Sequence, residues 1–337
     1  MSRQDLASVR RRERVLRILR FVVIYATLVL LLYVALRNAP LAAIWNTLQQ
    51  LRLSQIGIIL VLNALVIASI SLRWWVIVRA DNPGVPLLPL IGYRLSVFAL
   101  SYFTPGPQVG GEPLQVFYLQ RNHGLSFARA TSAVILDKLL ELLANFVLVC
   151  LGLAATFRLG LMARYGSQAI GAAAPLAAIL AWPAVHLVML YQRRHPISRL
   201  LQLAAPLVGN PRWARLIVIS EHMAAAFTRR RLPWLLASLA FSLLATAGMT
   251  AEYYLMASFL SAPLTLAETV AALSAAVLAF LLPLPGGLGA LEASQVLVLA
   301  AFGQPASVAI SLALLMRGRD MVNGGLGLLL AGRGLHR

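Results

Sequence analysis

One short pattern occurs twice in this sequence, each time within a long apolar stretch. Residues 105–116 and 285–296 both read P-G-x5-E-x2-Q-V, at a separation of 180 positions (285 minus 105). A Pro-Gly break frees backbone groups that lipid cannot satisfy, and a carboxylate at membrane depth costs a few kcal/mol. Two interrupted apolar segments at corresponding places in two halves are typical of a binding site between repeats, so the pattern predicts a membrane transporter.

The composition also predicts an integral membrane protein. Hydrophobic residues make up 60% of the chain and charged residues 12%, and apolar runs of roughly 18 residues or more recur along it. The net charge of +18 comes almost entirely from arginine, because Lys138 is the single lysine among 29 basic residues. The arginines gather between apolar runs, which is typical of cytoplasmic loops and not of nucleic-acid binding. One cysteine, Cys150, lies in an apolar run and allows no intramolecular disulfide or cysteine-based metal site, and we expect it to serve in packing.

Counting basic residues at the ends of the apolar runs predicts the topology. We expect an all-α polytopic membrane protein with about six transmembrane helices and two re-entrant helical hairpins in an inverted repeat. The expected segments are a cytoplasmic basic N-terminus (1–20), a first transmembrane half (21–191) with a hairpin at 87–120, a cytoplasmic amphipathic segment (192–231), a second half (232–332) with a hairpin at 266–302, and a cytoplasmic tail (333–337). Within the first half, residues 21–36 are expected to form the first span.

The span after each hairpin carries a base and an acid three residues apart. Lys138 and Glu141 recur as Arg317 and Asp320, 179 positions later (317 minus 138). Residues three apart lie on one face of a helix, so each pair is expected to neutralise itself in part while presenting a cation to the bundle interior.

A half-helix that begins near each Pro-Gly break would offer unpaired N–H groups and a positive dipole end to an anion. Glycines there would let a head group approach the backbone closely. Glu112 and Glu292 fit either as first-turn acids or as partners for a cationic head group or a proton. The expected substrate-binding residues are Gly106, Gly110, Gly111, Glu112, Lys138, Glu141, Gly286, Gly287, Gly289, Glu292, Arg317 and Asp320.

Other polar residues have less certain roles in the sequence. Arg73, followed by two tryptophans, is interpreted as an interfacial anchor, with contact to lipid phosphate as the alternative. Arg94 fits either a site contact or snorkelling to the interface. Glu252 fits either a helix-packing cluster or a gate, and Asp137 is given no role. We expect no metal, cofactor or catalytic residue, because no metal-ligand spacing, P-loop or G-x-S-x-G sequence occurs.

Residues 105–114 followed by Asp137, Lys138 and Glu141, and residues 284–292 followed by Arg317, resemble the lysylphosphatidylglycerol synthase transmembrane region, also called the flippase-like family. The resemblance runs from about residue 21 to residue 331. It implies a polytopic inner-membrane protein that moves or helps to modify lipids. In multidomain members this region flips aminoacylated phosphatidylglycerol made by a fused synthase domain, which we expect this chain to lack. The family usually has acid-Arg-x2-Asp where this chain has Asp137, Lys138 and Glu141.

We therefore expect a lipid translocase, and not an enzyme, in the bacterial cytoplasmic (inner) membrane with both termini in the cytoplasm. It would move a phospholipid or a lipid-linked anionic head group by alternating access. The expected partners are the membrane lipid substrate, anionic lipids of the inner leaflet and a separate lipid-modifying synthase, and nucleic acid is not expected. Two alternatives stay open: a small-solute or ion secondary transporter, and a membrane partner of a separate synthase.

Overall fold

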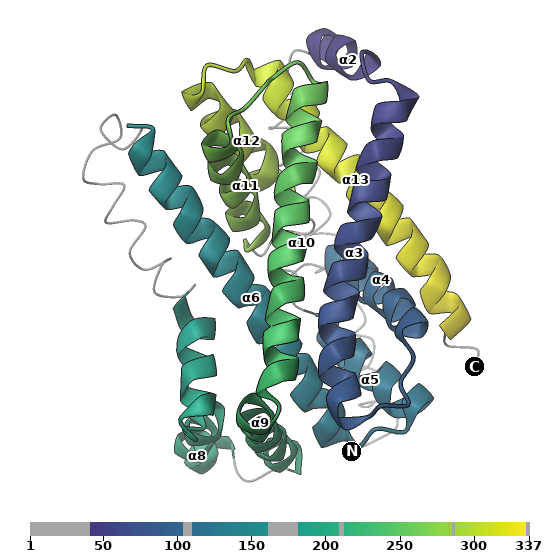
Figure 1. Ribbon diagram of the computed structural model, residues 1–337, viewed down its shortest axis with the longest axis vertical. Coiled ribbons are helices and arrows are strands. Elements are labelled where there is room, and N and C mark those ends of the chain that lie inside the picture. Colours follow the sequence, from purple (N-terminus) through teal and green to yellow (C-terminus); the bar gives the residue numbers. More distant parts are fainter. Residues whose placement is uncertain are drawn as a thin grey trace, which may run out of the picture.

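The structure is a computed structural model that describes residues 41–103, 110–160, 181–208, 212–282, 284 and 287–334. In this part of the chain every regular element is a helix (Figure 1). The helices are, in chain order, α2 (Leu41–Gln49), α3 (Leu53–Asp81), α4 (Leu87–Phe103), α5 (Glu112–His123), α6 (Phe127–Arg158), a short helix Ala181–Tyr191, α8 (Pro196–Val208), α9 (Arg212–Arg230), α10 (Leu232–Phe259), α11 (Leu266–Phe280), α12 (Ala290–Ala301) and α13 (Ala306–Gly334). The expected first span, residues 21–36, and both Pro-Gly breaks lie outside the described residues.

Three of the described helices, α3, α6 and α10, are long and apolar enough to cross a membrane. They have 29, 32 and 28 residues, and a helix rises about 1.5 Å per residue, so each exceeds a hydrocarbon core of about 30 Å. Helix α13 has 29 residues, but Arg317, Arg319 and Asp320 near its centre make it more polar. The protein is therefore a helical membrane protein.

The segments expected to be hairpins each fold into two short helices. Helices α4 and α5 have 17 and 12 residues, and α11 and α12 have 15 and 12. Each is shorter than the roughly 20 residues that cross a bilayer. Figure 1 shows α4 and α5 in the lower part of the bundle and α11 and α12 in the upper part.

The long helices bring the two short-helix pairs together. Helices α3 and α10 pack side by side at the centre and run in opposite directions (Figure 1). Helix α4 packs on α13, and α11 packs on α6, so each short-helix pair contacts a long helix from the other part of the chain. Apolar cores form around Trp74 and Leu136 at one end and around Met256 and Leu312 at the other.

Large apolar side chains on the outer faces of the long helices are exposed, among them Leu65, Leu151, Leu244 and Leu326. In a membrane protein such faces contact lipid. Cys150 on α6 is also exposed, so the expectation that it serves in packing is wrong. This stretch of α6 therefore has two faces, because Leu148 is buried against the neighbouring helices while Cys150 and Leu151 face outward.

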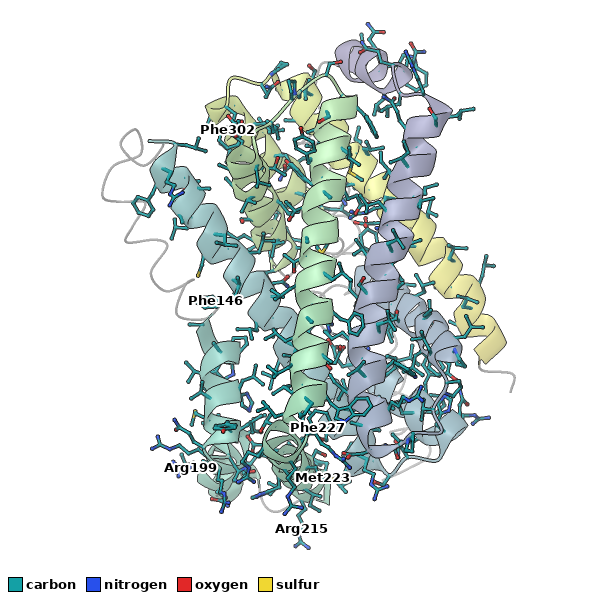
Figure 2. All side chains as sticks on the ribbon, in the orientation of Figure 1. Phe146, Arg199, Arg215, Met223, Phe227 and Phe302 are labelled. Atoms are coloured by element: carbon teal, nitrogen blue, oxygen red, sulfur yellow. The ribbon has the colours of Figure 1, made fainter. Side chains whose placement is uncertain are left out.

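Helices α8 and α9 lie at the lower end of the bundle, where Arg199 and Arg215 extend outward (Figure 2). They occupy the segment that was expected to be amphipathic. Glu221 of α9 is fully buried and accepts bonds from the N–H groups of Ile197 and Ser198 at 2.8 and 2.7 Å. Because the first N–H groups of a helix lack intrahelical partners, the Glu221 carboxylate holds the start of α8 on α9.

Candidate functional site

The two glutamates of the repeated pattern lie in the first turns of α5 and α12 and accept bonds from backbone N–H groups just before these helices. The Gly110 N–H donates to Glu112 at 2.7 Å, and the Gly289 N–H donates to Glu292 at 2.9 Å. These contacts fit the first-turn role considered for both glutamates. Gly106 and Gly286, also expected at the site, lie outside the described residues.

The other two described glycines of the expected site also have acceptors for their N–H groups. Gly111 donates to Ser101 Oγ at 3.1 Å, and Gly287 donates to the Leu284 carbonyl at 3.0 Å. A head group that used these N–H groups, or those of Gly110 and Gly289, would therefore have to displace a bond within the protein.

Gly111 lies at a point of close contact between α5 and α4. A Cβ at this position would lie 2.5 Å from Val97 Cγ1 and 2.7 Å from the Val97 carbonyl oxygen, which is closer than Cβ atoms approach. Any side chain at residue 111 would therefore push the two short helices apart.

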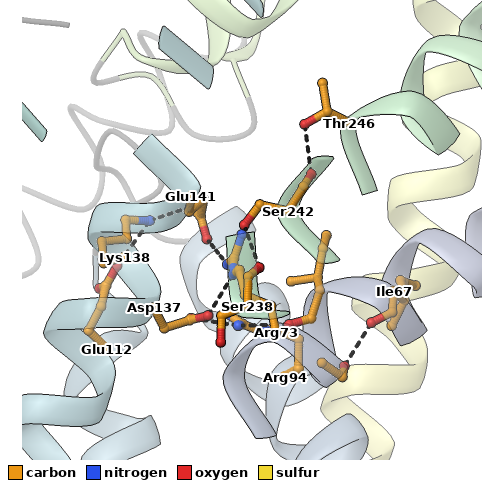
Figure 3. A network of polar contacts seen from close by, with 12 residues as sticks. Ile67, Arg73, Arg94, Glu112, Asp137, Lys138, Glu141, Ser238, Ser242 and Thr246 are labelled. Atoms are coloured by element: carbon orange, nitrogen blue, oxygen red, sulfur yellow. Dashed lines mark hydrogen bonds and ion pairs between the residues drawn. The ribbon is translucent and has the colours of Figure 1, made fainter. Parts of the chain in front are cut away.

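Lys138 connects the first short-helix pair to the long helix that follows it. Its ammonium lies 2.7 Å from Glu141 and 3.3 Å from Glu112, and all three side chains are partly exposed (Figure 3). The expected pairing of Lys138 with Glu141 on one face of α6 is confirmed. The contact with Glu112 adds a link to the start of α5.

Behind Lys138 lies a buried ion-pair network that joins α3, α4 and α6. Arg73 Nε donates to Asp137 at 2.7 Å, and its Nη2 donates to Glu141 at 3.1 Å. Arg94 donates to the other Asp137 oxygen at 2.5 Å (Figure 3). Arg73 is 2% exposed, so its interpretation as an interfacial anchor is wrong. Of the two roles considered for Arg94, the structure favours the site contact.

A second ion pair links α12 to α13. The Arg317 guanidinium donates to both oxygens of Glu292 and to the Gly287 carbonyl. Arg317 and Glu292 are 6% and 5% exposed. A guanidinium and a carboxylate in this two-point arrangement fix their relative orientation, so the start of α12 is held against α13.

Arg319 joins two carboxylates near the centre of the bundle. It donates to Asp320 at 2.8 and 3.0 Å and to Glu252 of α10 at 2.9 Å. Asn63 of α3 lies 3.5 Å from the same Glu252 oxygen and accepts a bond from Asn323 at 2.9 Å. The cluster therefore connects α3, α10 and α13, which fits the helix-packing role considered for Glu252.

A cavity of about 260 Å³ lies between these networks. Its apolar wall includes Ile67, Phe98, Met249 and Phe280. Its polar wall draws on both parts of the chain: the charged residues that line it are Arg73, Arg94, Glu112, Asp137, Lys138, Glu141, Glu252, Arg319 and Asp320. Lys138, Glu141, Glu112 and Asp320 of the expected site are therefore brought together, while Glu292 and Arg317 are not among the lining residues.

Asp137, Arg319, Glu252 and Asn63 were not among the expected site residues. One sequence signal does point to Glu252: it lies 179 positions after Arg73 (252 minus 73), the same separation as Lys138 and Arg317. No group of three or more His, Cys, Asp or Glu side chains in the described ranges could hold a metal ion.

Residues 17–325 match a family model described as the lysylphosphatidylglycerol synthase TM region. Comparisons with curated proteins and with solved structures gave no match.

Proposed function

Since the chain belongs to the lysylphosphatidylglycerol synthase TM region family, we propose that it moves a phospholipid or a lipid-linked anionic head group across the cytoplasmic membrane. It carries the lipid by alternating access and does not modify it chemically. The acyl or prenyl chains stay in the bilayer while the head group crosses between two halves of the protein.

The proposal includes an inverted repeat that consists of α3 to α6 and α10 to α13. Support comes from the equal order of a long helix, two short helices and a long helix in each, and from the opposite directions of α3 and α10. The cross-packing is reciprocal as well. Ser274 of α11 donates to the Leu148 carbonyl at 2.9 Å, and Ser96 of α4 donates to the Gly327 carbonyl at 3.2 Å. The two acceptors are 179 positions apart (327 minus 148) and the two donors 178 (274 minus 96), so nearly corresponding positions form the two bonds.

The observation that carries the proposal is the cavity lined by ion pairs from both halves. Pockets that enclose a whole drug-sized ligand measure about 300–1,000 Å³, and this cavity of about 260 Å³ is smaller. Its size suits a head group better than a whole lipid. Its lining includes both charged and apolar side chains, which suits a molecule that has both a polar and an apolar part.

Lys138 is the residue best placed to contact the head group. Its ammonium has three donors, and Glu112 and Glu141 account for two. Arg94 Nε and Gln115 Nε2 are buried donors without partners among the described residues, and both side chains line the cavity. Because buried donors are rarely left unpaired, they favour a ligand rich in acceptor oxygens, such as a phosphate ester.

The proposed orientation places α8 and α9 on the cytoplasmic side. Among the described residues, arginines cluster at this end, for example Arg199 and Arg215 (Figure 2), whereas Arg52 precedes α3 and Arg158 ends α6 at the other end (Figure 1). Cytoplasmic loops carry such an excess. Trp213 and Leu203 are exposed on these amphipathic helices, so α8 and α9 would rest on anionic lipids of the inner leaflet. A separate lipid-modifying synthase would supply or use the lipid.

Purified protein in phosphatidylcholine vesicles that contain labelled phosphatidylglycerol tests the proposal. We expect the label in the inner leaflet to become accessible to an impermeant quencher faster than in protein-free vesicles. A parallel set of vesicles, loaded with a small fluorescent anion, should retain its contents. Solute release without lipid exchange by folded protein would replace the proposal with a solute transporter.

A further inference from the structure

Among the residues that the structure describes, the charges around the cavity do not balance. Four basic residues line it (Arg73, Arg94, Lys138 and Arg319), against five carboxylates (Glu112, Asp137, Glu141, Glu252 and Asp320). Placing an uncompensated charge in a low-dielectric interior is costly, so a protein normally removes it by pairing or by binding a proton.

The excess carboxylate belongs to the cluster around Arg319. In the first half, three bases face three acids within one connected network. In the second half, the single guanidinium of Arg319 is shared between Glu252 and Asp320. Arg317 forms its ion pair with Glu292, so this base and this carboxylate balance each other and leave the count around the cavity unchanged.

One carboxylate oxygen of Glu252 is buried and accepts no hydrogen bond from the described residues. The side chain is fully buried, and both of its neighbouring donors, Arg319 and Asn63, approach the same oxygen, Oε2. The other oxygen, Oε1, has no hydrogen-bond partner in the part of the chain that the structure describes. A buried carboxylate oxygen that accepts no bond is a poor place for negative charge and a suitable place for a proton.

Comparison with the first half shows why the second half differs. Arg73 lies 179 positions before Glu252 and makes direct contact with Glu141, whose counterpart is Asp320 (320 minus 141). Where the first half pairs a base with an acid, the second half sets two acids near each other with Arg319 between them. At these corresponding positions the second half therefore has an acid in place of a base, and the one guanidinium of Arg319 faces both Glu252 and Asp320.

We propose that Glu252 and Asp320 share one transported proton, held on Glu252 Oε1, and that this proton couples to movement of the head group. The proton comes from water on one side, converts the carboxylate to a neutral carboxyl and leaves to water on the other side as the carboxylate re-forms. Glu112 and Glu292, the glutamates first considered for a proton, are each paired with a base.

This inference rests on the proposed function and adds a driving force to it. With the proton bound, the four bases and four remaining carboxylates of the cavity balance, so an anionic head group meets no net negative charge. Without the proton, the head group is repelled. Because linkage is reciprocal, an anionic head group binds more tightly at lower pH, and its binding raises the affinity for the proton.

Two measurements on the full chain test the proposal separately. The first is the infrared spectrum at neutral pH, where a protonated carboxyl has a carbonyl band that carboxylates lack. We expect this band in the wild type, its loss in Glu252→Gln, and its retention in Glu268→Gln, a matched control at an exposed helix cap. Asp320→Asn should also lose the band, because it removes the excess carboxylate and leaves Arg319 for Glu252 alone.

The second measurement is leaflet exchange of labelled phosphatidylglycerol under an imposed pH gradient. We expect the gradient to change the wild-type rate by about five-fold or more, the lower end of typical coupling between linked ligands, and to leave the Glu252→Gln rate unchanged. A carboxyl band that persists in folded Glu252→Gln, or sodium dependence in place of pH dependence, would overturn the proposal. If the wild type moves no lipid, the proposed function fails while the infrared result still decides whether Glu252 holds a proton.

Discussion

Arg73 on α3 and Glu252 on α10 line the same cavity, one with a basic and the other with an acidic side chain. Arg73 pairs directly with Asp137 and Glu141, whereas Glu252 reaches Asp320 only through Arg319. The two central helices therefore contribute different chemistry to a site that is otherwise built from corresponding elements. The first-half network is balanced and holds helices together, and the second-half cluster has a carboxylate in excess.

Replacing Arg73 by leucine should destabilise the protein strongly. Removing one partner of a buried ion pair leaves an uncompensated charge and costs roughly 3–5 kcal/mol, and we expect about 3 here because Arg94 still contacts Asp137. Denaturant unfolding in detergent micelles measures the loss. Arg231→Ala breaks an exposed pair with Asp81 and should cost no more than about 1 kcal/mol. Similar losses in both variants would show that burial of the Arg73 network contributes nothing.

The contact between α13 and α4 should tolerate no side chain at Gly327. A Cβ there would lie 2.1 Å from the Leu95 carbonyl oxygen, which is backbone and cannot move aside cheaply. We expect Gly327→Ala to lower the thermal midpoint, by an amount equivalent to roughly 1–3 kcal/mol. Gly325→Ala is the matched control on the same helix, since no atom lies within 4 Å of its added Cβ. Equal midpoints in the two variants would contradict the close packing of α4 on α13.

The positions of the helices and the pairing of Lys138 with Glu141 on α6 could be predicted from the sequence, because both depend on residues that are close together in the chain. Runs of apolar residues and the glycine-rich breaks predict α3, α10 and the two short-helix pairs. The spacing of Lys138 and Glu141 predicts their contact, since residues three apart share a helix face.

The partners of Arg73 and Glu252 could not be predicted in the same way. Arg73 precedes two tryptophans, a combination that is common at membrane interfaces, and only packing of α3 on α6 brings it to Asp137. Glu252 and Arg319 are 67 positions apart. The separation of 179 residues indicates that Arg73 and Glu252 occupy corresponding positions in the two halves. It does not predict which side chains each of them contacts.

The attachment of α8 to α9 should depend on pH through Glu221. Burial alone would raise its pKa, but His186, Ser198 and the N–H groups of Ile197 and Ser198 stabilise the carboxylate and lower the pKa to about 2. A pKa below the ordinary value of 4.5 means that the stabilisation is complete above pH 4.5 and is lost as the pH falls toward 2.

Spin labels at residues 200 and 216, in a Cys150→Ala background, measure this attachment. We expect a narrow distance distribution at pH 7 that broadens between pH 4.5 and 2. Glu221→Gln should be broad at every pH, because an amide oxygen accepts more weakly than a carboxylate. A distribution that stays narrow at pH 2 would mean that Glu221 does not hold the start of α8.

Cys150 should resist thiol reagents in intact membranes. It is exposed on α6, eight residues before Arg158, so the outer face of this helix holds it in lipid, where the reactive thiolate does not form. We expect maleimide to label it only after the protein is unfolded in detergent. Arg158→Cys in a Cys150→Ala background should react in intact vesicles, and labelling of Cys150 under those conditions would place that face of α6 in water.

The most direct test of the central claim is leaflet exchange of labelled phosphatidylglycerol by Lys138→Ala. Loss of the ammonium should slow exchange about ten-fold or more, since a hydrogen bond to a charged group is worth roughly 1.5–3 kcal/mol. Lys138→Arg should retain part of the activity, and Arg158→Ala, at the far end of α6, should match the wild type. Wild-type exchange by a folded Lys138→Ala protein would contradict a transport site at this cavity.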